Sequence, residues 1–406
     1  MARIKEIKAR KILNSKGNPT IETTVFLSNN IKGVASVPSG TSVGKYEAWE
    51  EKDINKAIKN IETIVTPRLS GLEVNNQKEI DKIMIDIDGT KNKQKLGANS
   101  ILSVSIAVAK TASQNLSVPL FEYLSNLTQK KQSKLKIPTP CFNLINGGKH
   151  GCDNLDLQEF LVIPRSSMSF KSQLKICSNV YSSLEKLLKD HHLTTQMGDE
   201  GGFSPNFQTN KEALSFLKQS VEAASLKQGL DIFLGLDCAA SNFYKNGKYF
   251  IKDIRYPLSS SELVSYYNDL SSDFSLLYLE DPLAENDWNG WTDLTSKIPK
   301  VSLIAGDDLT TTNPLKLKKA FEINAITAII IKPNQIGTVT EALEVVEIAR
   351  KKGLKIIVSH RSGETKDDFI ADFAVAVVAD YVKFGALVQK ERIAKYNRLL
   401  QIESQL

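Results

Sequence analysis

Hydrophobic and polar positions follow one rhythm in the first part of this chain. Residues 21–27 alternate loosely between apolar and polar side chains, which predicts an amphipathic strand. A polar turn at residues 28–30 leads to a second short strand that ends at Pro38. Helical patterns follow. The clearest covers residues 98–116, whose polar face is so narrow that we expect a buried helix.

A second rhythm begins at about residue 137. Short apolar runs each end in a charged or polar residue, and a helical segment follows each run. The run-ending residues are Asp237, Glu280, Asp307, Lys332, His360 and Lys383. Their spacing suits one strand, one turn and one helix, as in the βα units of an α/β barrel. An open doubly wound sheet would give a similar rhythm, but only a closed barrel brings six strand ends around one mouth, so the sequence favours the barrel.

Local signals add detail to this pattern. Asn246 and Gly247 lie between two short apolar runs and predict a β-hairpin. Thr338 and Glu341 have the spacing of a helix capping box, and residues 351–353 end in a glycine that can stop the helix. A polar, lysine-rich connector at residues 130–136 separates the two rhythms. We therefore expect an N-terminal α+β domain over residues 1–130 and a C-terminal α/β barrel domain over residues 131–406.

Composition excludes several classes of function. The net charge of +6 comes from scattered lysines rather than a basic stripe, which argues against nucleic-acid binding. The four cysteines lack metal-site spacing and lie among apolar neighbours, as in a reduced protein without a disulfide framework. The N-terminus lacks the apolar segment of a secretory signal, and no apolar stretch is long enough to span a membrane. We expect a cytoplasmic protein without a membrane span.

The acidic strand ends suggest a metal site. Asp237, Glu280 and Asp307 end three consecutive strands, so their carboxylates would repel one another at a barrel mouth unless a cation neutralised them. Oxygen ligands from few side chains suit Mg²⁺. Any one of these acids could instead cap the following helix. Three in register, followed by Lys332 and Lys383, favour the metal.

Lys332 follows the most apolar strand in the chain, residues 325–331. Desolvation there would lower its pKa and make it a usable base. The alternative is a lysine whose amine reaches solvent at the strand end. The turn sequence Lys-Pro-Asn-Gln-Ile-Gly fixes the exit of the chain and favours a functional lysine.

Two loops offer further candidates. His360, Arg361 and Ser362 could hold a phosphate, although a solvated loop explains them equally well. Glu200 lies in a glycine-rich turn between a helix and a strand. The geometry of such a turn explains the glycines but not the acidic residues. Residues 38–45 superficially resemble a P-loop, but the spacing is one residue short and Tyr46 replaces the required Ser or Thr. We reject a nucleotide site there; a mobile lid or an ordinary turn remains.

The whole chain resembles the enolase family in ordered blocks of sequence. The matching blocks are Asn-Pro-Thr-Ile-Glu (18–22), Val-Pro-Ser-Gly-Thr-Ser (37–42), Lys-Leu-Gly-Ala-Asn-Ser-Ile-Leu (95–102), Ile-Asn-Gly-Gly-Lys-His (145–150), Leu-Gln-Glu-Phe (157–160), Gly-Asp-Glu-Gly-Gly-Phe (198–203), Glu-Asp-Pro-Leu-Ala-Glu (280–285), Lys-Pro-Asn-Gln-Ile-Gly (332–337), Ser-His-Arg-Ser-Gly-Glu-Thr (359–365) and Ala-Lys-Tyr-Asn (394–397). The resemblance implies an N-terminal α+β cap, followed by an atypical barrel that begins ββαα. It implies a homodimer or higher homo-oligomer that reversibly dehydrates 2-phosphoglycerate to phosphoenolpyruvate in glycolysis and gluconeogenesis.

The same resemblance assigns roles to individual residues. It implies two Mg²⁺ ions per active site, the first bound by Asp237, Glu280 and Asp307 and the second by Ser42 of the lid. The catalytic residues would be Lys332, which removes the proton from C2, and Glu200 with its support Glu159, which protonates the departing C3 hydroxyl. Substrate would be held by His150, Gln158, His360, Arg361, Ser362 and Lys383.

Some positions depart from the usual family pattern, but none of them removes a catalytic group. They are Asn14, Lys16, Val43, Lys149, Phe384, Leu387 and Gln401. These departures could affect the kinetics of the lid and the dimer contacts of Arg10, Glu22 and Glu391. One rival reading is another member of the same superfamily, which would lack the set formed by Glu200, the Arg361-Ser362 pair and the Ser42 loop. The other is a catalytically silent enolase that serves as a binding protein, which would have lost a metal or base residue.

Overall fold

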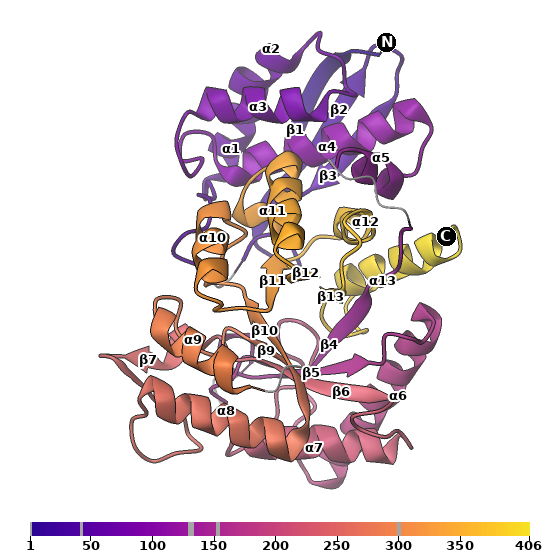
Figure 1. Cartoon of the computed structure of the whole chain (residues 1–406). Helices are drawn as coiled ribbons and strands as arrows, with labels where there is room; N and C mark the ends of the chain where they lie inside the picture. Colours follow the sequence, from indigo (N-terminus) through magenta and orange to yellow (C-terminus); the bar gives the residue numbers. More distant parts are fainter. Residues whose placement is uncertain (1, 41–43, 129–133, 152–154, 299–301) are drawn as a thin grey trace.

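The computed structural model describes residues 2–40, 44–128, 134–151, 155–298 and 302–406. Its N-terminal part is a three-stranded antiparallel sheet with helices packed on it, drawn in indigo and purple in Figure 1. The strands are β1 (Ile4–Leu13), β2 (Pro19–Leu27) and β3 (Lys32–Ser36). The predicted strand at residues 21–27 is confirmed as β2, whereas β1 was not predicted and β3 ends two residues before Pro38. The helices are α1 (Ile54–Asn60), the π-helical turn η1 (Ile61–Val65), α2 (Thr66–Leu69), α3 (Gln77–Asp88), α4 (Ala98–Leu116) and α5 (Leu120–Asn126).

Helix α4 is the buried helix that the sequence predicted. It packs against β2 and β3, and its residues are buried along most of its length. The close approach of β3 to this helix depends on Gly33, because a Cβ there would lie 2.4 Å from Thr111 Oγ1. A narrow polar face is therefore the expected consequence of a helix enclosed on nearly all sides.

The C-terminal part is a closed eight-stranded barrel with the strand order β10-β11-β12-β13-β4-β5-β6-β9. All pairs are parallel except those of β5, which runs antiparallel to β4 and β6, as the resemblance implied for a barrel that begins ββαα. All six predicted strands are present: Asp237, Glu280 and Lys383 are the last residues of theirs, whereas Asp307, Lys332 and His360 directly follow theirs. The strands are β4 (Thr139–Asn146), β5 (Glu159–Pro164), β6 (Ile232–Asp237), β9 (Leu276–Glu280), β10 (Leu303–Gly306), β11 (Ala328–Ile331), β12 (Lys355–Ser359) and β13 (Tyr381–Lys383).

Helices surround the barrel, and short elements join its strands. The helices are α6 (Phe170–Asp190), α7 (Asn210–Ala223), α8 (Ser260–Phe274), α9 (Trp288–Lys297), α10 (Pro314–Glu322), α11 (Val339–Lys351), α12 (Phe369–Ala376) and α13 (Lys390–Glu403), with 3₁₀ turns η2 (Gly148–His150), η3 (Ala240–Phe243) and η4 (Pro333–Gln335). The predicted hairpin is confirmed as β7 (Tyr244–Lys245) and β8 (Lys248–Tyr249), with Asn246 and Gly247 both at positive φ. None of these helices, nor any other in the described ranges, is long and apolar enough to cross a membrane.

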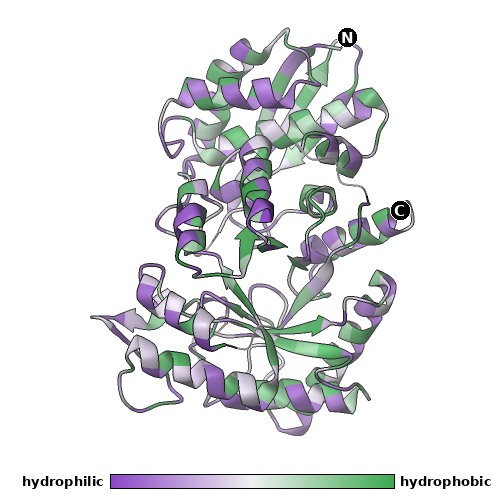
Figure 2. Ribbon diagram, in the orientation of Figure 1, coloured by the Kyte–Doolittle hydropathy of each residue, from purple (hydrophilic) through white to green (hydrophobic). Residues whose placement is uncertain are grey.

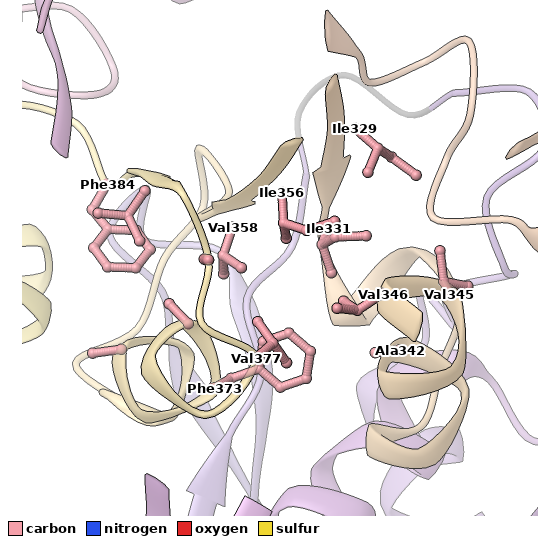
Figure 3. Close-up of a cluster of buried hydrophobic side chains, with 14 of the residues drawn as sticks. Ile329, Ile331, Ala342, Val345, Val346, Ile356, Val358, Phe373, Val377 and Phe384 are labelled. Atoms are coloured by element: carbon pink, nitrogen blue, oxygen red, sulfur yellow. The ribbon is translucent and has the colours of Figure 1, made fainter. Parts of the chain in front are cut away.

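The barrel strands are apolar on both faces because each face meets other protein. Ile330 of β11 lies in the barrel interior, while Ile329 and Ile331 point outward to the helices. Figure 3 shows the outward side chains of β11 and β12 packed against α11 and α12. In Figure 2 the strands are accordingly green, while the helices combine green and purple positions.

Helix α11 shows how far the predicted capping box is realised. The Thr338 side chain accepts a hydrogen bond from the backbone N–H of Glu341, so the N-cap is confirmed. The Glu341 carboxylate accepts from the Thr338 hydroxyl and pairs with Lys93 of the N-terminal part. The helix ends at Lys351, and Gly353 follows at a φ of +75°.

The N-terminal part reaches the barrel mouth at two points. Ser39 and Gly363 exchange two backbone hydrogen bonds of 2.9 and 3.0 Å. The backbone N–H of Ser15 donates to the carbonyl of Glu364, and the Ser15 hydroxyl accepts from the N–H of Glu364. The segment that follows β12 is thereby held between the two parts of the molecule.

Candidate active site

Lys383 links two of the predicted metal ligands at the barrel mouth. Asp237 and Glu280 end neighbouring strands in register, and Lys383 ends β13. Its Nζ lies 2.8 Å from Asp237 Oδ2, 2.7 Å from Glu280 Oε2 and 3.3 Å from Glu159 Oε2. All four side chains are buried. One ammonium therefore serves three carboxylates, which leaves this group of side chains short of positive charge.

Asp307, the third predicted ligand, follows β10 and pairs with another lysine. Its carboxylate forms an ion pair with Lys332 and accepts a hydrogen bond of 3.1 Å from Gln335 Nε2. Its oxygens also lie within 4.8 Å of carboxylate oxygens of Asp281 and Asp308. This group of three acids thus includes only one member of the predicted triad.

These acids suit a hard cation. Glu280 Oε1 is buried and accepts no hydrogen bond from the described residues, so one lone-pair-bearing oxygen lacks a partner. Burial, reinforced by the neighbouring charge of Asp237, raises the pKa of Glu280 well above its usual range. Burial and the charge of Asp307 likewise raise the pKa of Asp308 to about 7. A divalent cation ligated by oxygen would relieve both the desolvation and the repulsion, and the donors present fit Mg²⁺. Ser42, assigned to a second ion, lies outside the described residues.

The predicted net shift of the Lys332 pKa is wrong in sign. Burial does lower the pKa of this lysine, as expected, but the Asp307 carboxylate outweighs burial and the pKa is raised above its ordinary value. The sequence places Lys332 after an apolar strand, yet it does not show that a carboxylate from the neighbouring strand end lies against the amine. The ion pair keeps the amine protonated in this state.

Glu159, Glu200 and His150 form a second group at the mouth. Glu159 reaches it because β5 runs antiparallel to its neighbours, so that the first residue of this strand faces the last residues of the others. His150 Nδ1 lies 3.2 Å from Glu159 Oε1 and 3.6 Å from Glu200 Oε1. Asn143 Nδ2 donates to Glu200 Oε2 at 3.2 Å.

The pKa values of Glu159, Glu200 and His150 are shifted in different directions. Burial, with the charge of Glu200, raises the pKa of Glu159 to about 7. Burial acts in the same direction on Glu200, but His360 and His150 outweigh it and hold the pKa of Glu200 well below its usual range. Burial lowers the pKa of His150, but the two carboxylates raise it above its ordinary value. The group thus contains exchangeable protons beside a buried pocket.

The segment after β12 supplies the predicted phosphate ligands. His360, Arg361 and Ser362 are all buried, so the alternative of a solvated loop is wrong. Arg361 makes a bidentate ion pair with Glu47, with distances of 2.9 and 3.1 Å from its two terminal nitrogens. Asn334 Oδ1 accepts a further hydrogen bond from Arg361 Nη1 at 3.1 Å.

Glu47 is a site residue that the sequence analysis missed. It belongs to the N-terminal part and lies 314 positions from its partner Arg361 in the chain. It also accepts a hydrogen bond from the backbone N–H of Gly44, immediately after residues 41–43. No local pattern marks a single glutamate as the partner of so distant an arginine.

One pocket collects the candidate side chains. It has about 440 Å³ of empty space, part of it open to solvent. Eleven of the thirteen predicted site residues line it, together with Ala239, Asp281, Asp308 and Ser359. The predicted residues on its wall are His150, Gln158, Glu159, Glu200, Asp237, Asp307, Lys332, His360, Arg361, Ser362 and Lys383. Glu280 is not on the wall but pairs with Lys383, and Ser42 lies outside the described residues.

Several departures from the family pattern are accommodated near the pocket. Asn14 Nδ2 donates to Ser39 Oγ at 2.8 Å, and Lys16 pairs with Asp199 beside Glu200. Phe384 is fully buried in the cluster of hydrophobic side chains that Figure 3 shows between the barrel strands and the helices. Val43 lies outside the described residues.

Comparisons with known proteins agree with this arrangement. Residues 4–124 match the domain family described as "Enolase, N-terminal domain", and residues 134–406 match "Enolase, C-terminal TIM barrel domain". Proteins named "Enolase" from two strains of Ehrlichia ruminantium, Gardel and Welgevonden, are each 44% identical over 414 aligned positions, covering 100% of this chain and 97% of each relative. The chain therefore belongs to the enolase family and is a phosphopyruvate hydratase.

Proposed function

We propose that this enzyme reversibly dehydrates 2-phosphoglycerate to phosphoenolpyruvate, as a step of glycolysis and gluconeogenesis. Lys332 removes the proton from C2, and Glu200, supported by Glu159, protonates the departing C3 hydroxyl. The observation that carries the proposal is the single pocket that brings Lys332, Lys383 and Arg361 together with the Glu159–Glu200 pair. Lys383 and Arg361 are thus available as cations for the carboxylate and the phosphate, Lys332 is available as the base at C2, and the Glu159–Glu200 pair is available as the acid at C3.

We also propose that the site uses two Mg²⁺ ions, with Asp237, Glu280 and Asp307 as ligands of the first and Ser42 of the second. Bound Mg²⁺ would supply the concentrated positive charge that an enolate dianion needs. The chain's own residues then have separate tasks. Lys383 fixes Asp237 and Glu280 beside the substrate carboxylate, Arg361 and Ser362 hold the phosphate, and His150, Gln158 and His360 complete the walls.

The ion pair between Lys332 and Asp307 connects metal binding to the base. A cation on the Asp307 carboxylate would compete with Lys332 for that carboxylate. Loss of the ion pair removes the interaction that raises the pKa of Lys332, and burial then dominates and lowers it. Lys332 would thereby be freed from its role as counter-ion and could act as a base.

The assembly and the domain boundary are part of the same proposal. We place the boundary between the capping domain and the catalytic barrel at residues 130 and 131, and we infer a homodimer or higher homo-oligomer. Within one chain Arg10 pairs with Glu22 at 2.6 Å, and Gln401 accepts a hydrogen bond from Arg398. A change of partner for Arg10 or Glu22 on assembly would therefore break an existing ion pair.

Separate variants of the base and the acid test the assignment. Exchange of the C2 proton with deuterated water reports on Lys332 alone, whereas phosphoenolpyruvate formation needs both groups. We expect Lys332→Ala to lose exchange and dehydration together, and Glu200→Gln to keep exchange while losing dehydration by about 10²–10⁴-fold. Lys297→Ala, an exposed lysine on α9, is the matched control and should change neither rate. Near-normal exchange in folded Lys332→Ala would overturn the role of this lysine.

A further inference from the structure

Arg392, near the start of α13, is a fully buried arginine for which the reaction as proposed above has no role. Its side chain is 0% exposed, and it lies next to the segment that carries His360, Arg361 and Ser362. Among the described residues no carboxylate lies within ion-pair distance of it. A buried guanidinium without a direct carboxylate partner is costly, so its other contacts need an explanation.

Those contacts are carbonyl oxygens and one imidazole nitrogen. Nη1 donates to the carbonyl of Arg361 at 2.6 Å and lies 2.8 Å from His360 Nδ1. Nη2 donates to the carbonyl of Ser362 at 2.9 Å and makes a longer contact of 3.4 Å with that of Asp199. The guanidinium therefore joins the two loops that carry His360 and Glu200.

The contact with His360 fixes where the imidazole carries its proton. A guanidinium can only donate, so His360 Nδ1 must accept and carries no hydrogen. The proton of the neutral ring then lies on Nε2, which is 3.0 Å from Glu200 Oε2. The angle at the N–H does not meet that of a hydrogen bond in this structure, so Nε2 is a buried donor beside the Glu200 carboxylate without a formed hydrogen bond among the described residues. Burial and the neighbouring Arg392 charge lower the pKa of His360 to about 4, although Glu200 and Glu364 act in the opposite direction, which keeps the ring neutral.

Gly385 allows a second loop to approach the ring closely. A Cβ at Gly385 would lie 3.0 Å from His360 Cε1 and 2.8 Å from the carbonyl oxygen of Glu200, and this glycine has a φ of +79°. The loop between β13 and α13 thus passes close to the edge of the imidazole and leaves no room for a side chain at Gly385.

We propose that Arg392 is a positioning residue that holds His360 in the neutral form with its proton on Nε2 and thereby presents a hydrogen-bond donor to Glu200. The inference rests on the proposed role of Glu200 as the acid at C3. Without Arg392 the ring can carry its proton on Nδ1, which turns a lone pair towards the Glu200 carboxylate, or it can become an imidazolium. Either change alters the contact that holds Glu200 and the protonation of its surroundings.

Nitrogen NMR of the histidine rings tests the proton position without any turnover. The chain has four histidines, and a His360→Asn variant identifies the signals of this ring. In the native resting protein we expect His360 to be neutral, with Nε2 protonated, between about pH 5 and 8. In folded Arg392→Met we expect a signal from protonated Nδ1 in the same range. A native His360 with its proton on Nδ1, or an unchanged ring in folded Arg392→Met, would overturn the inference.

Lys395 offers a matched control on the same helix. It is 1% exposed, and it donates to backbone carbonyls of Thr365 and Asp367 as Arg392 does to its own partners. Unlike Arg392 it also pairs with a carboxylate, that of Glu364, at 2.9 Å. Lys395→Met should lower stability and remove the partner of Glu364, yet leave the proton of His360 on Nε2, because the Arg392 contact with Nδ1 is retained. A change of His360 in this variant equal to that in Arg392→Met would mean that Arg392 acts only through packing.

Kinetics separate this inference from the proposed function. We expect Arg392→Met to dehydrate 2-phosphoglycerate about 10–100-fold more slowly while C2 exchange is retained, and Arg392→Lys to recover part of the rate. Equal loss of exchange and dehydration would contradict a specific effect on Glu200. Absence of turnover in the native protein, together with the expected native spectrum, would overturn the proposed function and leave the Arg392–His360 contact intact. If Arg392→Met does not fold, the position of the His360 proton in the native spectrum and the dehydration rate of Arg392→Lys still test the inference.

Discussion

Replacing Lys383 by methionine tests whether one ammonium neutralises three buried carboxylates. The substitution keeps the length of the side chain and removes its charge, so Asp237, Glu280 and Glu159 lose their shared partner. Removing one member of a buried ion pair costs about 3–5 kcal/mol. For a chain of 406 residues this corresponds to a melting temperature about 4–6 °C lower. The carboxylates can partly compensate by taking up protons, because the pKa of Glu280 is already raised.

The assay is thermal unfolding in the presence of a chelator, followed by titration with Mg²⁺. We expect Mg²⁺ to raise the melting temperature of Lys383→Met more than that of the native protein, because the cation replaces a charge that the variant lacks. Lys297→Met is the control, since its side chain is 48% exposed and its pair with Asp293 lies on the surface. A Lys383→Met melting temperature within about 1 °C of this control would refute the reasoning.

Three further changes probe the fold. Ile330→Ala should cost about 2–5 kcal/mol in urea unfolding and Ile330→Val about 0.5–1.5 kcal/mol, because this side chain fills the barrel interior; equal effects would contradict that placement. Thr338→Ala should cost about 1 kcal/mol by loss of the N-cap, and no change would show that the cap is dispensable. Burial raises the pKa of Asp81 from 3.8 to about 6 against the opposing hydrogen bonds from Thr340, so its protonated form stabilises the fold below about pH 4 and this contribution is lost as pH rises through about 6. The loss amounts to at most about 3 kcal/mol and should vanish in Asp81→Asn; an unchanged pH profile of unfolding in that variant would contradict the shift.

The barrel could be predicted from sequence because its signal is local and repeated. Each apolar run between residues 232 and 383 ends in a polar side chain, and parallel strands in a closed sheet bring such ends together. The antiparallel strand β5 breaks this rule. Glu159 stands at the beginning of its strand rather than at the end, so only the family resemblance placed it at the mouth.

Contacts between distant segments could not be predicted. The Glu47–Arg361 pair joins the two parts of the molecule, and nothing near Glu47 in the chain distinguishes it from other glutamates. The direction of the pKa shift of Lys332 was predicted wrongly for the same reason. An apolar strand in the sequence indicates burial, but it does not indicate the distance between Lys332 and Asp307. Arg392 likewise has the sequence surroundings of an ordinary helical arginine, although its side chain is enclosed by the His360 loop.

Formation of phosphoenolpyruvate from 2-phosphoglycerate tests the central claim most directly. The reaction is followed by ultraviolet absorbance with saturating Mg²⁺ and again with excess chelator. We predict robust turnover with the metal, none with the chelator, and recovery when Mg²⁺ is restored. Absence of turnover in well-folded, Mg²⁺-loaded protein, or turnover that persists in excess chelator, would contradict the account.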